Sequence, residues 1–398
     1  DNLPHTKETH ADWDEIYETQ KNMTLLFRSL FEDMPILPSI GNHDTFPPNT
    51  LPIDNSSFGI YRGYLEKGGW NELLNNTDTS TFEKGGYYSM LMKEKLRIIS
   101  LNTVLWYFQN KLTAKLNDPA NQFQWLEEVL QNSSVNSEKV YIIGHIPPGH
   151  TARASPGKRG SLMYHSQHLE FYLRIIFNYT DIIAGQFYGH LHMDMFQLFR
   201  DRSGEFKGSS LLAPPVTPWY EGKGQNVSLP SNPSIRLVYY SLDDFKLLDY
   251  RQYVLNLTTA NCDRKERKKT YELLYSLTTF YGVEDLTTKS LVKVFQRLKR
   301  NSNWFDEFFR FLTAGMETVD CEKTCRVAQI CAMTGITPYH YDTCWNASDK
   351  LFYTKQLSSP KNSIIIFICI SILPIIILLL IIGYILYKKF KASQNKTE

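Results

Sequence analysis

Short apolar runs and longer amphipathic segments alternate along the first part of the chain. Runs with the length and composition of buried strands occur at 36–40, 87–101, 140–143 and 181–188, and the second is long enough for two strands. Apolar positions recur at helical spacing in 13–34, 120–130 and 167–179. Because strands that alternate with helices are typical of α/β domains, the pattern predicts that fold class.

Two details of the pattern concern the core and the rim of this domain. The buried face of the first helix is expected to contain Ile16, Met23, Leu26, Phe27 and Leu30. Residues 45–80 are rich in Pro, Asn and Gly, which predicts a long loop. A long loop after a ligand motif is a plausible substrate rim.

Two further strands are predicted before the pattern of apolar residues changes at about residue 260. Runs at 209–212 and 235–242 predict further strands, and 249–257 closes the predicted catalytic domain. Residues 263–345 are predicted to be helical, with a core of Leu273, Leu274, Leu277, Phe280, Phe305, Phe308, Phe309 and Leu312. The charge run at 263–269 has both signs, which is typical of a solvated helix start rather than a nucleic-acid site.

Residues 364–387 form an apolar, uncharged run near the end of the sequence. A helix needs about 20 apolar residues to span a bilayer, so the run predicts one transmembrane helix. Lys388, Lys389 and Lys391 follow it, which predicts that the tail 388–398 is cytosolic and that the body lies outside. A cleaved lipid-anchor signal is the alternative, although such signals normally end in the hydrophobic run.

Composition changes this picture only in part. The chain has 398 residues with a formal net charge of +2, and 42% of them are hydrophobic and 21% charged. These values are those of an ordinary globular protein and indicate no polyanionic partner. Glycosylation sequons before the apolar run favour a secreted, luminal or extracellular body; they lie at Asn22, Asn55, Asn75, Asn132, Asn178, Asn226, Asn256 and Asn346.

The cysteines point to the same compartment. Cys321, Cys325, Cys331 and Cys344 lie within one short stretch, which favours disulfides over free thiols. A zinc knuckle is the alternative, but its usual spacing is Cys-x-x-Cys. Cys262 is left without a predicted partner.

Candidate chemistry follows three of the predicted strands. Each strand ends in glycine and then in ligand-type side chains, in the motifs Gly41-Asn42-His43-Asp44, Gly144-His145 and Gly189-His190-Leu191-His192. A lone histidine is more often structural, but three such strand ends together indicate a shared site, because ligands bind beyond the carboxyl ends of strands in α/β sheets. Imidazole, carboxylate and amide oxygen are ligands that suit zinc or a similar divalent ion.

These motifs resemble those of the calcineurin-like metallophosphoesterases. Four finer features resemble the acid sphingomyelinase-like branch, namely 99–102, 118–122, the sequence 144–150 and the late cysteine pattern. The resemblance implies a four-layer α/β/β/α sandwich over 1–257, of which the N-terminal part is not in this chain. It further implies a helical, disulfide-bonded subdomain over 262–350, with the pairs Cys321–Cys325 and Cys331–Cys344.

The resemblance also implies an active site with two zinc ions. Asp1 bridges both metals in the matching motif, and one metal is completed by Asn42, His145 and His190. His192 belongs to the other metal. The general acid is expected to be His43, with His5 beside it, while Asp44 is a candidate to orient His43.

The implied activity is hydrolysis of a nucleotide or phospholipid phosphodiester by water activated between the metals. We expect a monomer that is anchored in a membrane, with its catalytic body extracellular or endolysosomal. The family's first motif, Asp-x-His, is absent from this chain. That absence supports an alternative of another class, a catalytically impaired membrane glycoprotein with the same fold that acts by binding.

Overall fold

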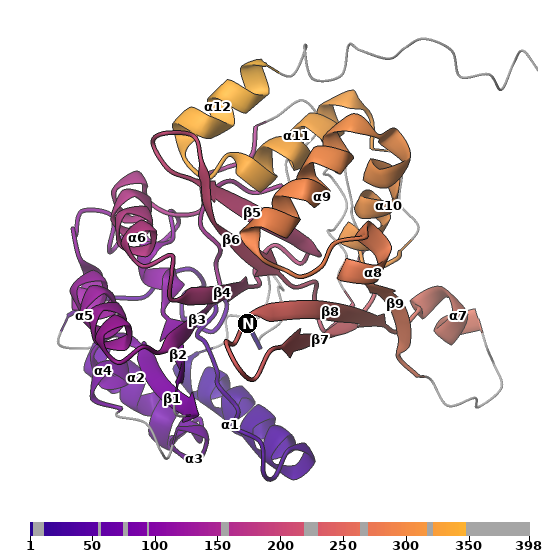
Figure 1. Ribbon diagram of the computed structural model, residues 1–398. Helices are drawn as coiled ribbons and strands as arrows, with labels where there is room; N and C mark the ends of the chain where they lie inside the picture. The colour runs from indigo at the N-terminus through magenta and orange to yellow at the C-terminus, as the bar shows by residue number, and fades with distance from the viewer. Residues whose placement is uncertain are drawn as a thin grey trace, which may run out of the picture. The chain divides into compact units, whose positions relative to one another are not determined.

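The computed structural model describes residues 1–2, 12–54, 57–74, 79–93, 95–152, 159–218, 230–262, 270–316 and 321–347. Asp1–Asn346 form one compact unit, and Ala347–Glu398 are a second unit. The first unit is a mixed α/β fold built on two sheets (Figure 1).

The larger sheet has six strands in the order β1-β2-β3-β4-β6-β5. They are β1 (Tyr88–Lys93), β2 (Leu96–Leu101), β3 (Lys139–Gly144), β4 (Ile183–Tyr188), β5 (Met195–Arg200) and β6 (Phe206–Leu212). The strands β2, β3, β4 and β6 are parallel, and β1 and β5 are antiparallel edge strands. The carboxyl ends of the four parallel strands therefore meet at one edge of the sheet, where ligand-bearing loops can converge.

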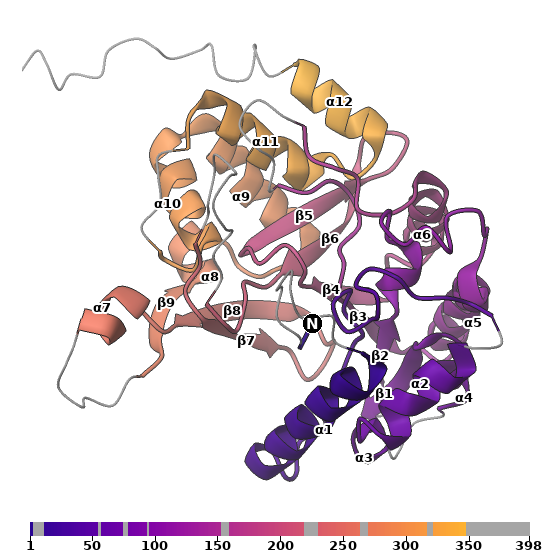
Figure 2. The same ribbon diagram turned by 180° about the vertical axis from the view of Figure 1, so that it is seen from behind.

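Helices from both halves of the chain cover this sheet (Figures 1 and 2). On the side of β1 to β4 lie α5 (Gln122–Val135) and α6 (Ser166–Asn178). On β5 and β6 pack α9 (Thr288–Arg300) and α11 (Lys323–Thr334), with α10 (Ser302–Leu312) beside α9 and α12 (Pro338–Asn346) beside α11. The helices α5 and α6 match the sequence prediction, and Phe305, Phe308, Phe309 and Leu312 are buried as expected.

The smaller sheet has three antiparallel strands, β7 (Ser234–Tyr240), β8 (Leu247–Val254) and β9 (Glu272–Ser276). Two short helices flank β9, namely α7 (Leu257–Cys262) and α8 (Leu277–Tyr281). The prediction that 263–345 is helical is therefore wrong at β9. Leu273 is 52% exposed on that strand, and Phe280 is 37% exposed, so neither belongs to the core as expected.

The segment predicted to be a rim loop, 45–80, instead contains helices. These are α2 (Ser57–Glu66), α3 (Trp70–Leu73) and the start of α4 (Ser80–Gly85). Tyr61 and Tyr64 of α2 are fully buried, and Tyr64 contacts Trp70 and Phe82. Aromatic packing between these helices outweighs the loop-like composition of the segment.

Helix α1 (Trp13–Leu30) forms where predicted but buries a different face. Leu26 and Leu30 are 48% and 62% exposed, so the expectation that they are core residues is wrong. The buried positions are Ile16, Gln20 and Thr24, with Tyr17 beside them. The two polar side chains are buried because they form hydrogen bonds, Gln20 to Asp44 and Thr24 to the Gly68 carbonyl.

The segment 36–40, predicted to be a strand, has no regular secondary structure and pairs with no strand among the described residues. Side chains of the neighbouring strands hold it instead. The hydroxyls of Tyr88 and Ser100 donate to the Pro38 carbonyl, and Ser39 Oγ donates to the Leu101 carbonyl. Pro38 has no backbone N–H to offer to a sheet ladder.

The C-terminal helices contain two disulfides, Cys321–Cys325 and Cys331–Cys344. These are the two pairs implied by the family resemblance, and Cys262 is free and exposed. The predicted spanning run 364–387 lies outside the described residues. None of the helices that the structure describes is long and apolar enough to cross a membrane.

Candidate metal centre

The predicted ligands lie at the carboxyl edge of the parallel strands. His145 directly follows β3, and His190 follows β4 after a single glycine. The turn after β4 begins with a hydrogen bond from the Gly189 N–H to the His145 carbonyl, 2.9 Å long. This bond joins the two strand ends and brings both imidazoles to the same place.

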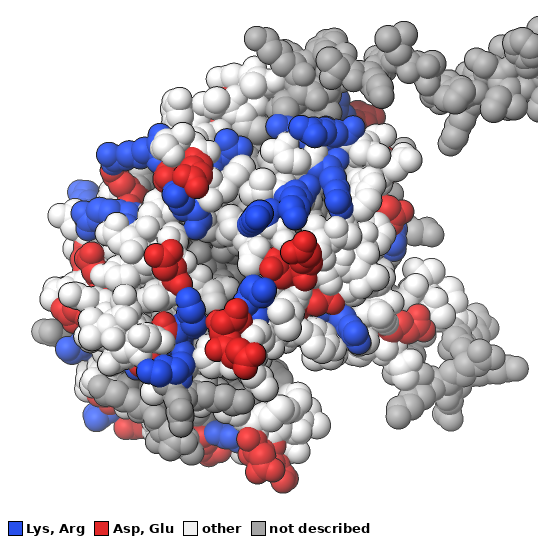
Figure 3. Space-filling view, viewed as in Figure 1, with Lys and Arg blue, Asp and Glu red and all other residues white. Residues whose placement is uncertain are grey.

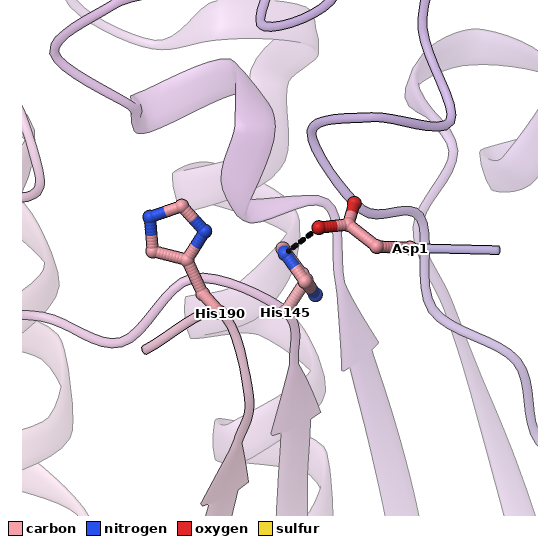
Figure 4. A group of neighbouring side chains, drawn as sticks. All are labelled: Asp1, His145 and His190. Carbon is pink, nitrogen blue, oxygen red and sulfur yellow. Dashed lines mark ion pairs between the residues drawn. The ribbon is translucent and has the colours of Figure 1, made fainter. Parts of the chain in front are cut away.

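Four ligand atoms converge at this edge, and Figure 4 shows the three residues Asp1, His145 and His190 that supply three of them. Ligand atoms of Asp1, His145 and His190 all lie within 4.8 Å of one another. His145 Nε2 is 2.9 Å from Asp1 Oδ2 and 3.0 Å from Asn42 Oδ1, and His190 Nδ1 is 2.8 Å from Asn42 Oδ1. Two imidazole nitrogens, one carboxylate and one amide oxygen form a donor set that fits a divalent cation.

Asn42 presents its oxygen, and not its nitrogen, to the two histidines. Its Nδ2 donates to Asn49 Oδ1 at 2.7 Å, and the Asn49 N–H donates to the Asn42 carbonyl at 2.7 Å. Because the amide nitrogen is already used, Oδ1 is left to face the imidazoles. Asn49, with φ 67°, was not singled out by the sequence, and its role becomes visible only in the folded loop.

Asp1 is held in place by the loop that carries Asn42. The His43 backbone N–H donates to Asp1 Oδ1 at 2.8 Å. Asp44 Oδ2 accepts from the Gly41 N–H at 2.9 Å and lies 3.2 Å from the Asp1 backbone nitrogen. Asp44 is 1% exposed, and its carboxylate contacts the backbone nitrogens of Asp1 and Gly41.

The remaining predicted residues surround this cluster. Burial is the largest cause of a lowered pKa at His43, and Asp44 opposes it. His192 lies at the end of the turn after β4, two residues beyond His190 and outside the group of three ligands. His5 lies outside the described residues. Tyr107 packs edge-on against His190 with ring centroids 5.1 Å apart.

Comparison with known proteins defines the class first. The family described as calcineurin-like phosphoesterase matches residues 9–194, and the family described as acid sphingomyelin phosphodiesterase C-terminal region matches 207–351. Calcineurin-like phosphoesterases are dimetal enzymes. A dimetal phosphatase from Danio rerio has a TM-score of 0.31 and 13% identity over 60% of this chain and 85% of its own, a likeness too low to carry weight.

Curated relatives then define the family. A cyclic GMP-AMP phosphodiesterase from Bos taurus is 37% identical over 87% of this chain and 74% of its own length. A human acid sphingomyelinase-like phosphodiesterase 3b is 32% identical over 87% of this chain and 75% of its own. A sphingomyelinase phosphodiesterase C from Dictyostelium discoideum is 33% identical over 84% and 73%.

The chain belongs to the acid sphingomyelinase-like phosphodiesterases, within the calcineurin-like metallophosphoesterases. It is a phosphoric diester hydrolase, and the convergent ligands at the ends of β3 and β4 are its candidate metal centre.

Proposed function

We propose that this protein is a zinc phosphodiesterase that binds two zinc ions and cleaves nucleotide phosphodiesters. The observation that carries the proposal is the convergence of Asp1, Asn42, His145 and His190 at one edge of the sheet. His192 would hold the second metal, and Asp1 would contribute a ligand to both sites. When bound, the metals supply charge neutralisation of the phosphoryl oxygens and an activated water.

The chain's own residues fix and complete this site. Asn49 orients the Asn42 amide, and Asp44 holds the backbone of Asp1 and Gly41. His43 is assigned as the general acid that protonates the leaving oxygen, because it follows Asn42 directly and its backbone contacts Asp1. His5 is the alternative acid.

A nucleotide is favoured over a phospholipid as substrate by the relatives. Those of 36–37% identity are named cyclic GMP-AMP phosphodiesterases, whereas those named sphingomyelinase-like or sphingomyelin phosphodiesterases are 29–33% identical. The same metal centre can attack either diester, so the choice rests on contacts to the leaving group.

Parallel assays with cyclic GMP-AMP and sphingomyelin test this choice. The zinc-loaded protein is expected to hydrolyse the dinucleotide at least tenfold faster, as kcat/KM, than sphingomyelin presented in detergent. A preference for sphingomyelin would overturn the nucleotide assignment and leave the phosphodiesterase assignment intact. Absence of hydrolysis on both substrates, with zinc bound, would favour the binding-only glycoprotein.

We also propose a membrane-anchored protein with an extracellular or endolysosomal body, as a monomer. Support comes from the two disulfides and from sequon asparagines that are exposed, namely Asn22, Asn132, Asn178, Asn256 and Asn346. A phospholipase that cleaves lipid anchors should leave the protein on the cell surface. Its release into the medium would instead establish the lipid anchor.

A further inference from the structure

The turn that carries His190 and His192 has an unusual backbone. The two residues have φ angles of 62° and 52°, in the left-handed region that side chains with a Cβ adopt at a cost. Leu191 and Met193 alternate with them and are only 3% and 2% exposed. Strained conformations of this kind persist only where the surrounding structure holds them.

Asp194 is the buried charge at the end of this turn. It is 2% exposed, and its backbone N–H donates to the Leu312 carbonyl at the end of α10, 3.0 Å away. Arg236 Nη2 donates to Asp194 Oδ1 at 2.5 Å, and Tyr250 donates to the same oxygen at 3.0 Å. Tyr275 donates to Oδ2 at 2.8 Å, so both carboxylate oxygens have partners.

The partners of Asp194 are themselves fixed. Arg236 also donates to Gln252 Oε1 at 2.8 Å and to the Leu212 carbonyl at 3.1 Å, and its guanidinium lies 3.9 Å from the Tyr250 ring centroid. Tyr275 stacks on Phe311 of α10 with ring centroids 3.9 Å apart. The network thus connects the turn to the end of β6, to the small sheet and to α10.

We propose that Asp194, together with Arg236, Tyr250 and Tyr275, positions the His190–His192 turn for metal binding. This inference rests on the proposed zinc-dependent function. Apolar residues of similar volume would fill the same space with comparable stability, whereas a fully hydrogen-bonded buried charge allows one geometry. Outer partners of this kind fix the orientation of metal ligands, and here the partner acts through the backbone of the turn.

Two conservative substitutions separate positioning from stability. Asp194→Asn keeps the size of the side chain but loses its charge, and Tyr275→Phe removes one hydrogen bond to Oδ2. We expect Asp194→Asn to weaken zinc affinity by about 10–100-fold, measured by competition with a chelator, because the histidine pair is no longer held in register. Tyr275→Phe should shift zinc affinity in the same direction by less, and excess zinc should restore part of the lost kcat in both variants.

Glu138→Gln is the matched control, because Glu138 forms a buried, bidentate pair with Arg97 at the starts of β3 and β2, at the opposite ends of the strands from the metal centre. It should lower the unfolding temperature without changing zinc affinity.

Wild-type zinc affinity in folded Asp194→Asn and Tyr275→Phe, whatever their unfolding temperatures, would overturn the positioning role. If Asp194→Asn does not fold, Tyr275→Phe decides alone. A wild-type protein that binds no zinc would overturn the proposed function itself, a result distinct from zinc-binding variants with unchanged affinity.

Discussion

At Gly41 the loop has no room for a side chain. A Cβ there would lie 2.0 Å from Asp1 Oδ1 and 2.5 Å from the Asp1 backbone nitrogen, so Asp1 or the loop has to move. Gly41→Ala is therefore expected to reduce bound metal and to lower kcat/KM by about tenfold or more, since a displacement of 1 Å can cost about 100-fold. Metal analysis and diester hydrolysis measure both effects.

Gly59→Ala is the control for this substitution. A Cβ at Gly59 meets no atom within 4 Å, and the residue lies inside α2. Alanine favours a helix over glycine by about 1 kcal/mol, so this variant should be as active as wild type and slightly more stable. Equal metal content and activity in the two alanine variants would contradict the placement of Asp1.

His43 is tested by its dependence on the leaving group. A general acid helps most when the leaving group is poor, whereas a metal ligand is needed for every substrate. His43→Ala should keep its zinc and lose about 10²–10⁴-fold on a nucleotide diester, but far less on a nitrophenyl ester. Equal losses on both substrates, or loss of zinc, would exclude His43 as the acid and make His5 the next residue to test.

The residues that could be predicted at this scale are those with a local signature. The glycine that precedes His145 or His190 marks the end of a strand, and the parallel sheet then brings these two histidines together. Asn49 was not predicted, and Asp44 was predicted only as a residue that orients His43, because their partners depend on the path of a folded loop. Asp194 carries no sequence signal, since its partners lie 42 to 81 positions away.

At the scale of elements, the sequence predicted the central strands and helices better than their surroundings. The strands β1 to β4 and the helices α5 and α6 have uninterrupted periodic patterns. The helices α2 to α4 were missed because their composition is that of a loop and aromatic packing decides the outcome. Strand β9 was missed because most of its side chains are at least partly exposed, and among the described strands it pairs with β8 alone.

One element-level prediction concerns the link between β2 and the start of β3. Hydrogen bonds from Arg97 are the largest cause of a lowered pKa at Glu138, and Ser133 adds to it. A carboxylate with a depressed pKa stabilises the fold above its unfolded pKa of about 4.3, and this stability is lost as pH falls through the folded value. Glu138→Gln should therefore cost about 1–3 kcal/mol at neutral pH and progressively less below about pH 4.

Denaturant unfolding at several pH values measures this difference. Glu205→Gln is the control, because its ion pair with Lys207 is exposed and contributes little at any pH. A Glu138→Gln penalty that stayed constant from neutral pH to pH 3 would contradict the assigned ionisation of this carboxyl group.

A second prediction concerns the disulfide Cys331–Cys344. The loop that it closes contains Gly335 and Tyr341, which hold His150 by a 2.7 Å hydrogen bond and by stacking at 4.1 Å. Replacing both cysteines with serine should cost about 3 kcal/mol and speed amide exchange in residues 149–152. The disulfide Cys321–Cys325 closes a shorter loop, so replacing both of its cysteines with serine should cost less. Equal amide exchange at 149–152 in the two double variants would contradict the connection between Cys331–Cys344 and His150.

At the scale of the whole molecule, the sequence predicted the balance of charge and the family. Acidic and basic side chains both lie over much of the face in Figure 3, and the formal net charge of the chain is +2. The relatives cover most of the chain, which is why motifs could predict the class of enzyme. The choice of metal and of substrate depends on contacts with bound ligands, which short motifs do not encode.

The most direct test of the account is a metal titration of the protein and of its His190→Ala variant. Zinc content is measured after chelation and after zinc is added back, together with hydrolysis of bis(4-nitrophenyl) phosphate. The account predicts that the wild-type protein loses activity with its metal and regains both, while His190→Ala binds less zinc and does not recover. Hydrolysis by the metal-free protein, or a His190→Ala variant with wild-type zinc content and rate, would contradict it.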